Sequence, residues 1–155
     1  NNHRITGLPS PSSDSDAVPK SYAQPADVKL INYPSAMGWY KIGTVTGDMC
    51  SVNTITIGGI FQNNQASPAV VDIATQYGSA RIIKRLSSLT DNQISRVGII
   101  AEDYVTYGVY VYYNSAKLNP VLINIHSHMG KFTPQEWGIS NVSDSNMLAV
   151  VTLKE

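Results

Sequence analysis

Apolar and polar positions alternate with a period of two residues along most of the chain from residue 39 onward. Residues 39–46 are rich in β-branched and aromatic side chains and stop at Gly47-Asp48, while residues 51–61 alternate apolar and polar side chains. Successive side chains of a strand point to opposite faces of its sheet, so this period predicts half-buried β-strands.

Eight such runs are separated by turn residues, and they span 39–46, 51–61, 69–77, 81–88, 96–101, 104–114, 121–129 and 147–154. Gly78-Ser79 predicts a hairpin, and Glu102-Asp103 predicts another short reversal. No window repeats apolar residues at helical spacing, which predicts little helix. The predicted fold class is therefore all-β, an antiparallel β-sandwich that is jelly-roll-like.

The first 38 residues have a different composition. They hold five of the eight prolines and the densest Ser/Asp cluster, 10–16. Proline disfavours helix at the preceding residue and donates no ladder hydrogen bond, so this segment is predicted to be extended. We expect an N-terminal connector, 1–38, followed by a β-sandwich domain, 39–155. Because the chain begins with Asn1, we also expect it to be a piece of a longer protein.

Charge and composition narrow the function classes. Eleven basic and eleven acidic residues cancel, which argues against a nucleic-acid binder. Only 14% of residues are charged, against about 25% in an average soluble domain, and 17 Ser, 12 Asn and 10 Thr supply neutral polarity instead. No apolar run is long enough for a membrane span, so no membrane insertion is expected. Cys50 is the single cysteine and excludes an internal disulfide.

Catalytic chemistry has little support in the sequence. No nucleophile-elbow, zinc-protease or phosphate-loop motif is present. Glycoside hydrolysis needs two carboxylates in one cleft, and the adjacent Glu102 and Asp103 suit a hairpin tip better, since neighbouring strand residues face opposite ways. The chain is predicted not to be an enzyme, and no cofactor is expected.

Five of the nine tyrosines lie within residues 104–113. Strand alternation places Val105, Tyr107, Val109, Val111 and Tyr113 toward the core. Tyr104, Tyr110 and Tyr112 then face outward, where three interpretations stay open: cross-strand packing, a subunit interface, or contact with a ligand such as a sugar. Tyr110 and Tyr112 are the candidates for a trimer interface.

His126 and His128 flank Ser127 late in a strand-like run. As residues i and i+2 of a strand, they are predicted to share one face. Before Gly130, the simpler interpretation is a polar strand end that faces solvent.

The N-terminal segment resembles a connector of bacteriophage tail fibres. The resemblance rests on an I-T-x-L-P-x-P-like stretch from Ile5 to Pro11, then Ser13-Asp14-Ser15-Asp16-Ala17-Val18, then Lys20 and Tyr22. Further on, residues 38–44 and the Y-V-Y-Y-N stretch at 110–114 are similar to C-terminal β-domains of tail fibres and tailspikes.

This resemblance implies a homotrimeric head domain at the distal end of a fibre on the virion, which binds a host surface receptor. A surface polysaccharide or lipopolysaccharide is the first expectation, and an outer-membrane protein is the second. The alternatives are a trimerisation or folding domain without receptor contact, and a carbohydrate-binding module of a depolymerase tailspike. The resemblance also allows an axial metal ion held by His126 and His128 of three chains.

The resemblance transfers no binding motif, so candidate ligand contacts come from loop placement and residue type. These candidates are exposed aromatic and amide side chains: Asn63, Asn64, Gln65, Tyr77, Tyr104, Asn114, Trp137 and Asn141.

Overall fold

The computed structural model describes residues 27–32, 34–47, 50–59, 68–87, 93–114 and 121–154. These residues form ten strands and one 3-10 turn, η1. The elements are β1 (Asp27–Asn32), β2 (Gly38–Thr46), β3 (Cys50–Gly59), β4 (Ala69–Gln76), β5 (Ser79–Leu86), β6 (Ile94–Ala101), β7 (Thr106–Tyr113), β8 (Val121–Met129), β9 (Lys131–Ser140), η1 (Asp144–Asn146) and β10 (Ala149–Thr152).

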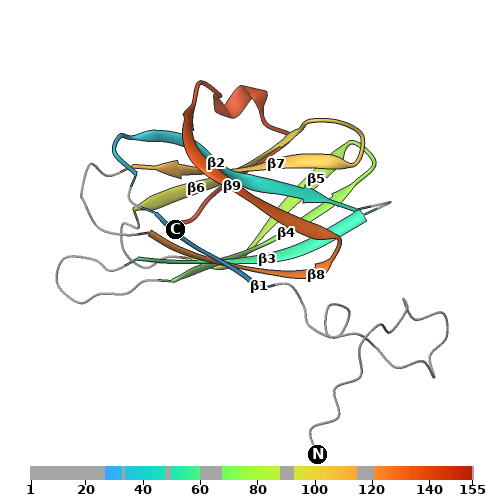
Figure 1. Cartoon of the computed structure of the whole chain (residues 1–155), viewed down its shortest axis with the longest axis horizontal. Helices are drawn as coiled ribbons and strands as arrows, with labels where there is room; N and C mark the ends of the chain where they lie inside the picture. The colour runs from blue at the N-terminus through green and yellow to red at the C-terminus, as the bar shows by residue number, and fades with distance from the viewer. Residues whose placement is uncertain are drawn as a thin grey trace, which may run out of the picture.

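The strands form two five-stranded antiparallel sheets that pack face to face (Figure 1). We call them sheet A, with the order β1-β8-β3-β4-β5, and sheet B, with the order β10-β6-β7-β2-β9. Strands far apart in the sequence pair with each other, as β1 with β8 and β2 with β7, which is the wrapping typical of jelly rolls. The prediction of an all-β antiparallel sandwich is confirmed.

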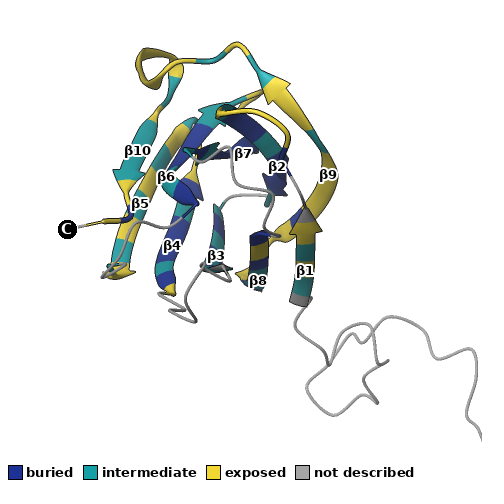
Figure 2. Ribbon diagram, turned by 90° about the vertical axis from the view of Figure 1, so that its left-hand side faces the viewer, coloured by how far each residue is buried: buried dark blue, intermediate teal, exposed yellow. Residues whose placement is uncertain are grey.

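The core lies between the two sheets, where the alternating apolar side chains meet. Ile55 and Ile57 of β3 are fully buried, and so are Val109 and Val111 of β7. Figure 2 shows this division, with buried segments on the inner strands and the exposed strand β9 at one edge. The predicted inward row is confirmed from Tyr107 to Tyr113, since both tyrosines are also buried. Its first member, Val105, was placed wrongly, because β7 begins only at Thr106 and Val105 lies half-buried in the preceding turn.

Two strands are absent from the predicted set. Strand β9 is an edge strand, and its side chains are mostly exposed, so it shows no alternation of apolar and polar positions. It also contains Pro134, which an edge strand tolerates because one side of its backbone needs no partner. Pro134 pairs with Gly43 next to a register shift, where three residues of β9 lie opposite one residue of β2.

Strand β1 lies inside the segment expected to be a connector. Its backbone pairs with β8 along its whole length, from Asp27 opposite His126 to Asn32 opposite Val121. The sandwich therefore begins before the predicted boundary at residue 38. Residues 1–26, which carry the fibre-like motif, lie outside the described residues, and their role as a connector stays a prediction.

Candidate functional site

The turn between β4 and β5 holds an aromatic side chain in an unusual backbone conformation. Tyr77 has φ 41° and is followed by Gly78 with φ 76°. Positive φ at both central residues is the signature of a two-residue type I′ hairpin turn, which usually takes Asn-Gly or Gly-Gly. The hairpin expected beside Gly78-Ser79 is therefore present, with a strained tyrosine at its first central position.

Tyr77 stacks on Tyr104, which belongs to the connection between β6 and β7. The ring centroids are 5.4 Å apart with an interplanar angle of 32°. Both rings face solvent, since Tyr77 is 44% exposed and Tyr104 is 64% exposed. The two predicted ligand residues thus form one aromatic platform, although 27 positions separate them in the sequence.

Backbone contacts fix the two turns to each other. The Gly78 amide donates to the Tyr104 carbonyl over 3.2 Å and to the Tyr107 hydroxyl over 2.6 Å. The Tyr107 hydroxyl lies 3.3 Å from the Tyr104 carbonyl, to which it donates. Because the Tyr107 side chain is buried, these contacts tie the platform to the core.

Asp103 shapes the second turn from its own side chain. Its Oδ1 accepts from the amides of Val105 over 2.8 Å and Thr106 over 2.7 Å. The pKa of the Asp103 carboxyl is held below its usual 3.8, first by the Val105 amide and then by the side chain and amide of Thr106. The carboxylate therefore stays ionised at neutral pH and orders the turn that carries Tyr104.

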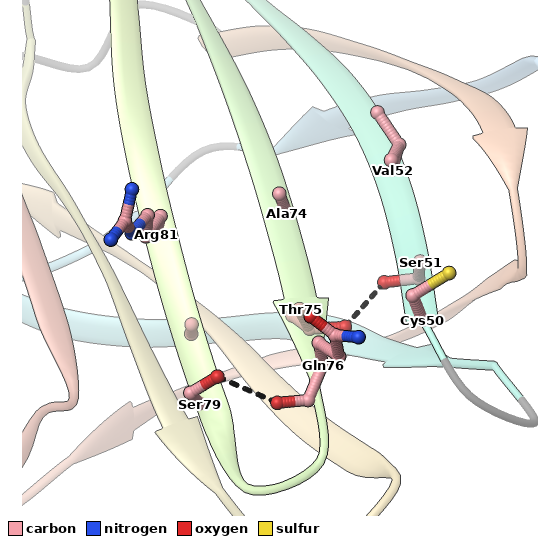
Figure 3. A pocket seen from close by; sticks show the side chains of 9 residues that line it. Cys50, Ser51, Val52, Ala74, Thr75, Gln76, Ser79 and Arg81 are labelled. Carbon is pink, nitrogen blue, oxygen red and sulfur yellow. Dashed lines mark hydrogen bonds between the residues drawn. The ribbon is translucent and has the colours of Figure 1, made fainter.

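A pocket of about 370 Å³ adjoins the Tyr77 turn on strands β3, β4 and β5 (Figure 3). Its lining includes the outward residues Val52, Ala74 and Arg81. Ser51 and Thr75 also line it, but their side chains lie on the buried inner face of the same strands, where the two hydroxyl oxygens are 2.7 Å apart. The Ser79 hydroxyl donates to the Gln76 carbonyl over 2.6 Å and closes the pocket toward the turn.

Next to the pocket, a chain of polar side chains crosses the outer face of sheet A. Arg85 pairs with Asp72, and the other oxygen of Asp72 accepts from the Thr54 hydroxyl over 2.8 Å. His128 Nε2 lies 2.8 Å from the same Thr54 oxygen. Since Thr54 has one hydroxyl proton and gives it to Asp72, His128 must donate from Nε2. Thr54 is therefore not poised to be deprotonated by His128 as a nucleophile.

His126 and His128 share one face, as predicted. Their rings are edge to face, with centroids 4.5 Å apart, on the outer face of sheet A. Among the described residues no group of three or more His, Cys, Asp or Glu side chains is placed to hold a metal ion. The axial metal site would need ligands from further chains, and it stays a prediction.

The predicted interface tyrosines have partners within their own chain. Tyr110 is only 8% exposed, and the ion pair of Lys41 with Glu102 lies beside it. Burial raises the pKa of its hydroxyl above 10.0. Tyr112 lies under the Arg96 guanidinium, 4.0 Å from the ring centroid. Both side chains lie on the outer face of sheet B, as expected, but their role in a trimer stays a prediction.

Arg96 organises that outer face. Its guanidinium also lies 5.1 Å from the centroid of the Trp39 ring and forms two hydrogen bonds with Asp144 of η1, at 2.6 and 2.8 Å. Trp39 is only 4% exposed although it is outside the main core cluster. The η1 segment thus covers this face. The Arg96 guanidinium contacts Trp39, Tyr112 and Asp144, all within the same chain.

The other predicted ligand residues do not join the platform. Asn114 follows the far end of β7, a strand about 24 Å long, whereas Tyr104 precedes its other end. Asn141 follows β9 and lies near the same far end, and half-buried Trp137 packs 6.4 Å from Tyr40 between ring centroids. Asn63, Asn64 and Gln65 lie outside the described residues.

Sequence reasoning did not identify Arg81, Thr54 or Asp72 as site residues. They meet because β3, β4 and β5 pair in register, with Thr54 opposite Asp72 and Ala74 opposite Arg81. The outward parity of β4 and β5 was the available signal, but only the strand pairing shows which residues are neighbours.

Solved structures with a similar fold exist, although no family model or curated protein matches this chain. A solved structure of WceF from Pantoea stewartii, described as a glycan biofilm modifying enzyme with a bacteriophage tailspike-like parallel β-helix fold, superposes with a TM-score of 0.57. It is 14% identical, and the match covers 85% of this chain and 23% of that one.

The tailspike protein of the Acinetobacter phage vB_ApiP_P1 gives a TM-score of 0.46 at 7% identity, over 87% of this chain and 26% of that one. The chain thus spans about a quarter of the length of either structure. The likeness to WceF shows the fold alone: part of that structure has the same arrangement of strands. In the part of the chain that the structure describes, no helix is long and apolar enough to cross a membrane.

Proposed function

We propose that this chain is the receptor-binding head domain of a phage tail fibre or tailspike and binds a bacterial surface glycan without cleaving it. The observation that carries the proposal is the exposed Tyr77–Tyr104 platform at one end of a rigid sandwich. The fold likeness to a tailspike-like protein that modifies a glycan biofilm, and the connector motif of residues 5–22, point in the same direction.

The platform suits a sugar for physical reasons. The apolar face of a pyranose ring packs on an aromatic ring, while the phenol hydroxyls can bond to the sugar hydroxyls. Tyrosine loses little conformational entropy on binding, because it has only two side-chain torsions. Tyr77 moreover occupies a backbone conformation that costs folding energy, and such strain is often retained where a side chain serves binding.

The proposal includes a homotrimer at the distal end of the fibre. Several weak sites on one rigid head, repeated over the fibres of a virion, raise avidity without high affinity at each site. Exposed apolar side chains remain on the outer face of sheet A, where Ile31 is 66% exposed and its register partner Leu122 is 44% exposed. This pair would be covered by a neighbouring chain. Light scattering should give about three times the chain mass, and a clean monomer would contradict the trimer.

Binding is tested with the purified chain and surface polysaccharide fractions from candidate host bacteria. Ligand-observed NMR should show saturation transfer to at least one fraction, and Tyr104→Ala should abolish it. Tyr104→Phe keeps the ring and should retain most of the transfer. Equal transfer by the wild type and Tyr104→Ala would overturn the platform as the binding site. Chain shortening of the polysaccharide during incubation would overturn the non-catalytic part of the proposal.

A further inference from the structure

The pocket beside the platform has a floor that the strand register creates. Ala74 of β4 lies between Val52 of β3 and Arg81 of β5, and all three face outward (Figure 3). Because alanine is smaller than its two flanking side chains, the face is hollowed there. The next outward row consists of Cys50, Gln76 and Ser79, which bring the hollow to the Tyr77 turn.

Arg81 supplies an uncompensated positive charge to this hollow. It is exposed, and among the described residues no carboxylate pairs with it. Arg85, the next outward arginine on the same strand, is by contrast paired with Asp72. That ion pair also neutralises the outward carboxylate of the adjacent row on β4, so the carboxylate repels an incoming anion less.

The remaining lining groups suit the hydroxyls of a sugar. Ser79 gives its proton to the Gln76 carbonyl, so its oxygen is left to accept a hydrogen bond. The Gln76 side chain is exposed and offers both a donor and an acceptor. In β5 the Cα atoms of Ser79 and Arg81 are about 6.6 Å apart, so Arg81 lies one outward position beyond the residue that follows the Tyr77 turn.

We infer that this hollow is a subsite for the carboxylate of a uronic acid, with the Arg81 guanidinium as the group that selects an acidic over a neutral glycan. A guanidinium presents two parallel N–H donors that match the two oxygens of a carboxylate. The inference rests on the proposed glycan-binding function and adds the class of sugar. The Tyr77–Tyr104 platform stacks on the sugar ring, and the hollow distinguishes an acidic from a neutral glycan.

The test compares two probes that differ only in whether their acidic sugars carry a carboxylate or a hydroxymethyl group. One is an oligosaccharide of alternating glucose and glucuronic acid, and the other is the same oligosaccharide after its carboxyl groups have been reduced to alcohols. Calorimetry on the wild type should show the acidic form binding about tenfold more tightly, as for hydrogen bonds to a charged group. Arg81→Gln should bring the two affinities together, and Arg81→Lys should restore part of the difference.

Lys29→Gln is the matched control, because it removes one positive charge from the same outer face on β1, at the opposite edge of sheet A. It should leave the tenfold preference intact, and a loss equal to that of Arg81→Gln would overturn the subsite in favour of general electrostatic attraction. Equal binding of both probes by the wild type, with loss in Tyr104→Ala, would overturn the subsite and support the platform. Binding of neither probe would count against both the subsite and the proposed glycan function.

Discussion

Replacing Tyr77 by Asn should make the domain at least as stable while it destroys glycan binding. A left-handed conformation costs an ordinary L-residue about 1–2 kcal/mol, and Asn-Gly is a preferred pair for a type I′ turn. The substitution therefore recovers about 1 kcal/mol at φ 41°. Against this stands the stacking on Tyr104, worth about 0.5–1.5 kcal/mol and near the lower end here because both rings are exposed.

The net change expected for Tyr77→Asn is thus between zero and a gain of about 1 kcal/mol. For a domain of this size a gain of 1 kcal/mol raises the melting temperature by about 2–4 °C. Urea denaturation followed by circular dichroism measures the free energy of unfolding directly. Tyr104→Ala loses the same stacking without relieving the turn, so it should cost about 0.5–1 kcal/mol.

Both variants should lose saturation transfer from the glycan fraction, so that stability and binding move independently. If Tyr77→Asn lost more than about 1 kcal/mol, the stacking would outweigh the backbone strain, and the platform would be a structural feature. If it gained stability and still bound the glycan, the platform would not be the binding site.

Three further variants test other parts of the structure. Arg96→Ala should lower the free energy of unfolding by about 1–2 kcal/mol, because it removes the cation–π contact with Trp39 together with an ion pair, and a loss under about 0.5 kcal/mol in urea would contradict this. Burial raises the pKa of the Tyr110 hydroxyl in the folded chain above its value of 10.0 in the unfolded chain. The contribution of Tyr110 to the free energy of unfolding is therefore complete below pH 10, and it is lost as the pH rises through the folded pKa. Tyr110→Phe should flatten the fall in stability measured between about pH 9 and 11.5. Gly43→Ala would push a Cβ into the Phe132 ring and should cost about 1–3 kcal/mol, and a melting temperature within about 1 °C of the wild type would refute the clash.

Alternation within single strands was enough to predict most of the sandwich. Val109 and Val111 face the core, as their parity indicates, and the turn at Gly78 lies within one residue of its expected place. β9 was not predicted because its side chains are mostly exposed, so it shows no alternation of apolar and polar positions. β1 was not predicted because Asp27–Asn32 lies in a proline-rich segment, and the composition of that segment indicated an extended connector.

One part of the candidate site could be predicted from the sequence and the other could not. Tyr77 and Tyr104 could be predicted because exposed aromatics in turns are unusual locally, without knowledge of the fold. The subsite could not be predicted. Ala74 forms the floor of the hollow because Val52 and Arg81 lie on either side of it, and this arrangement depends on the pairing of three strands. A sequence read alone gives the parity of each strand but not its partners or register.

The pair His126 and His128 is a second case in which the sequence predicts the face of a side chain but not its neighbours. A local rule places His126 and His128 on one face, and the structure agrees. The same rule does not predict the contact with Thr54, which lies 74 residues earlier in the chain. Because the Thr54 hydroxyl donates its proton to Asp72, the proton between Thr54 and His128 must be on His128 Nε2. With that proton given to Thr54, only Nδ1 of a neutral His128 carries a lone pair for a metal. An axial ion would therefore bind His128 through Nδ1 or displace the contact with Thr54, and the chemistry open to the motif is decided by a neighbouring strand rather than by the spacing of its histidines.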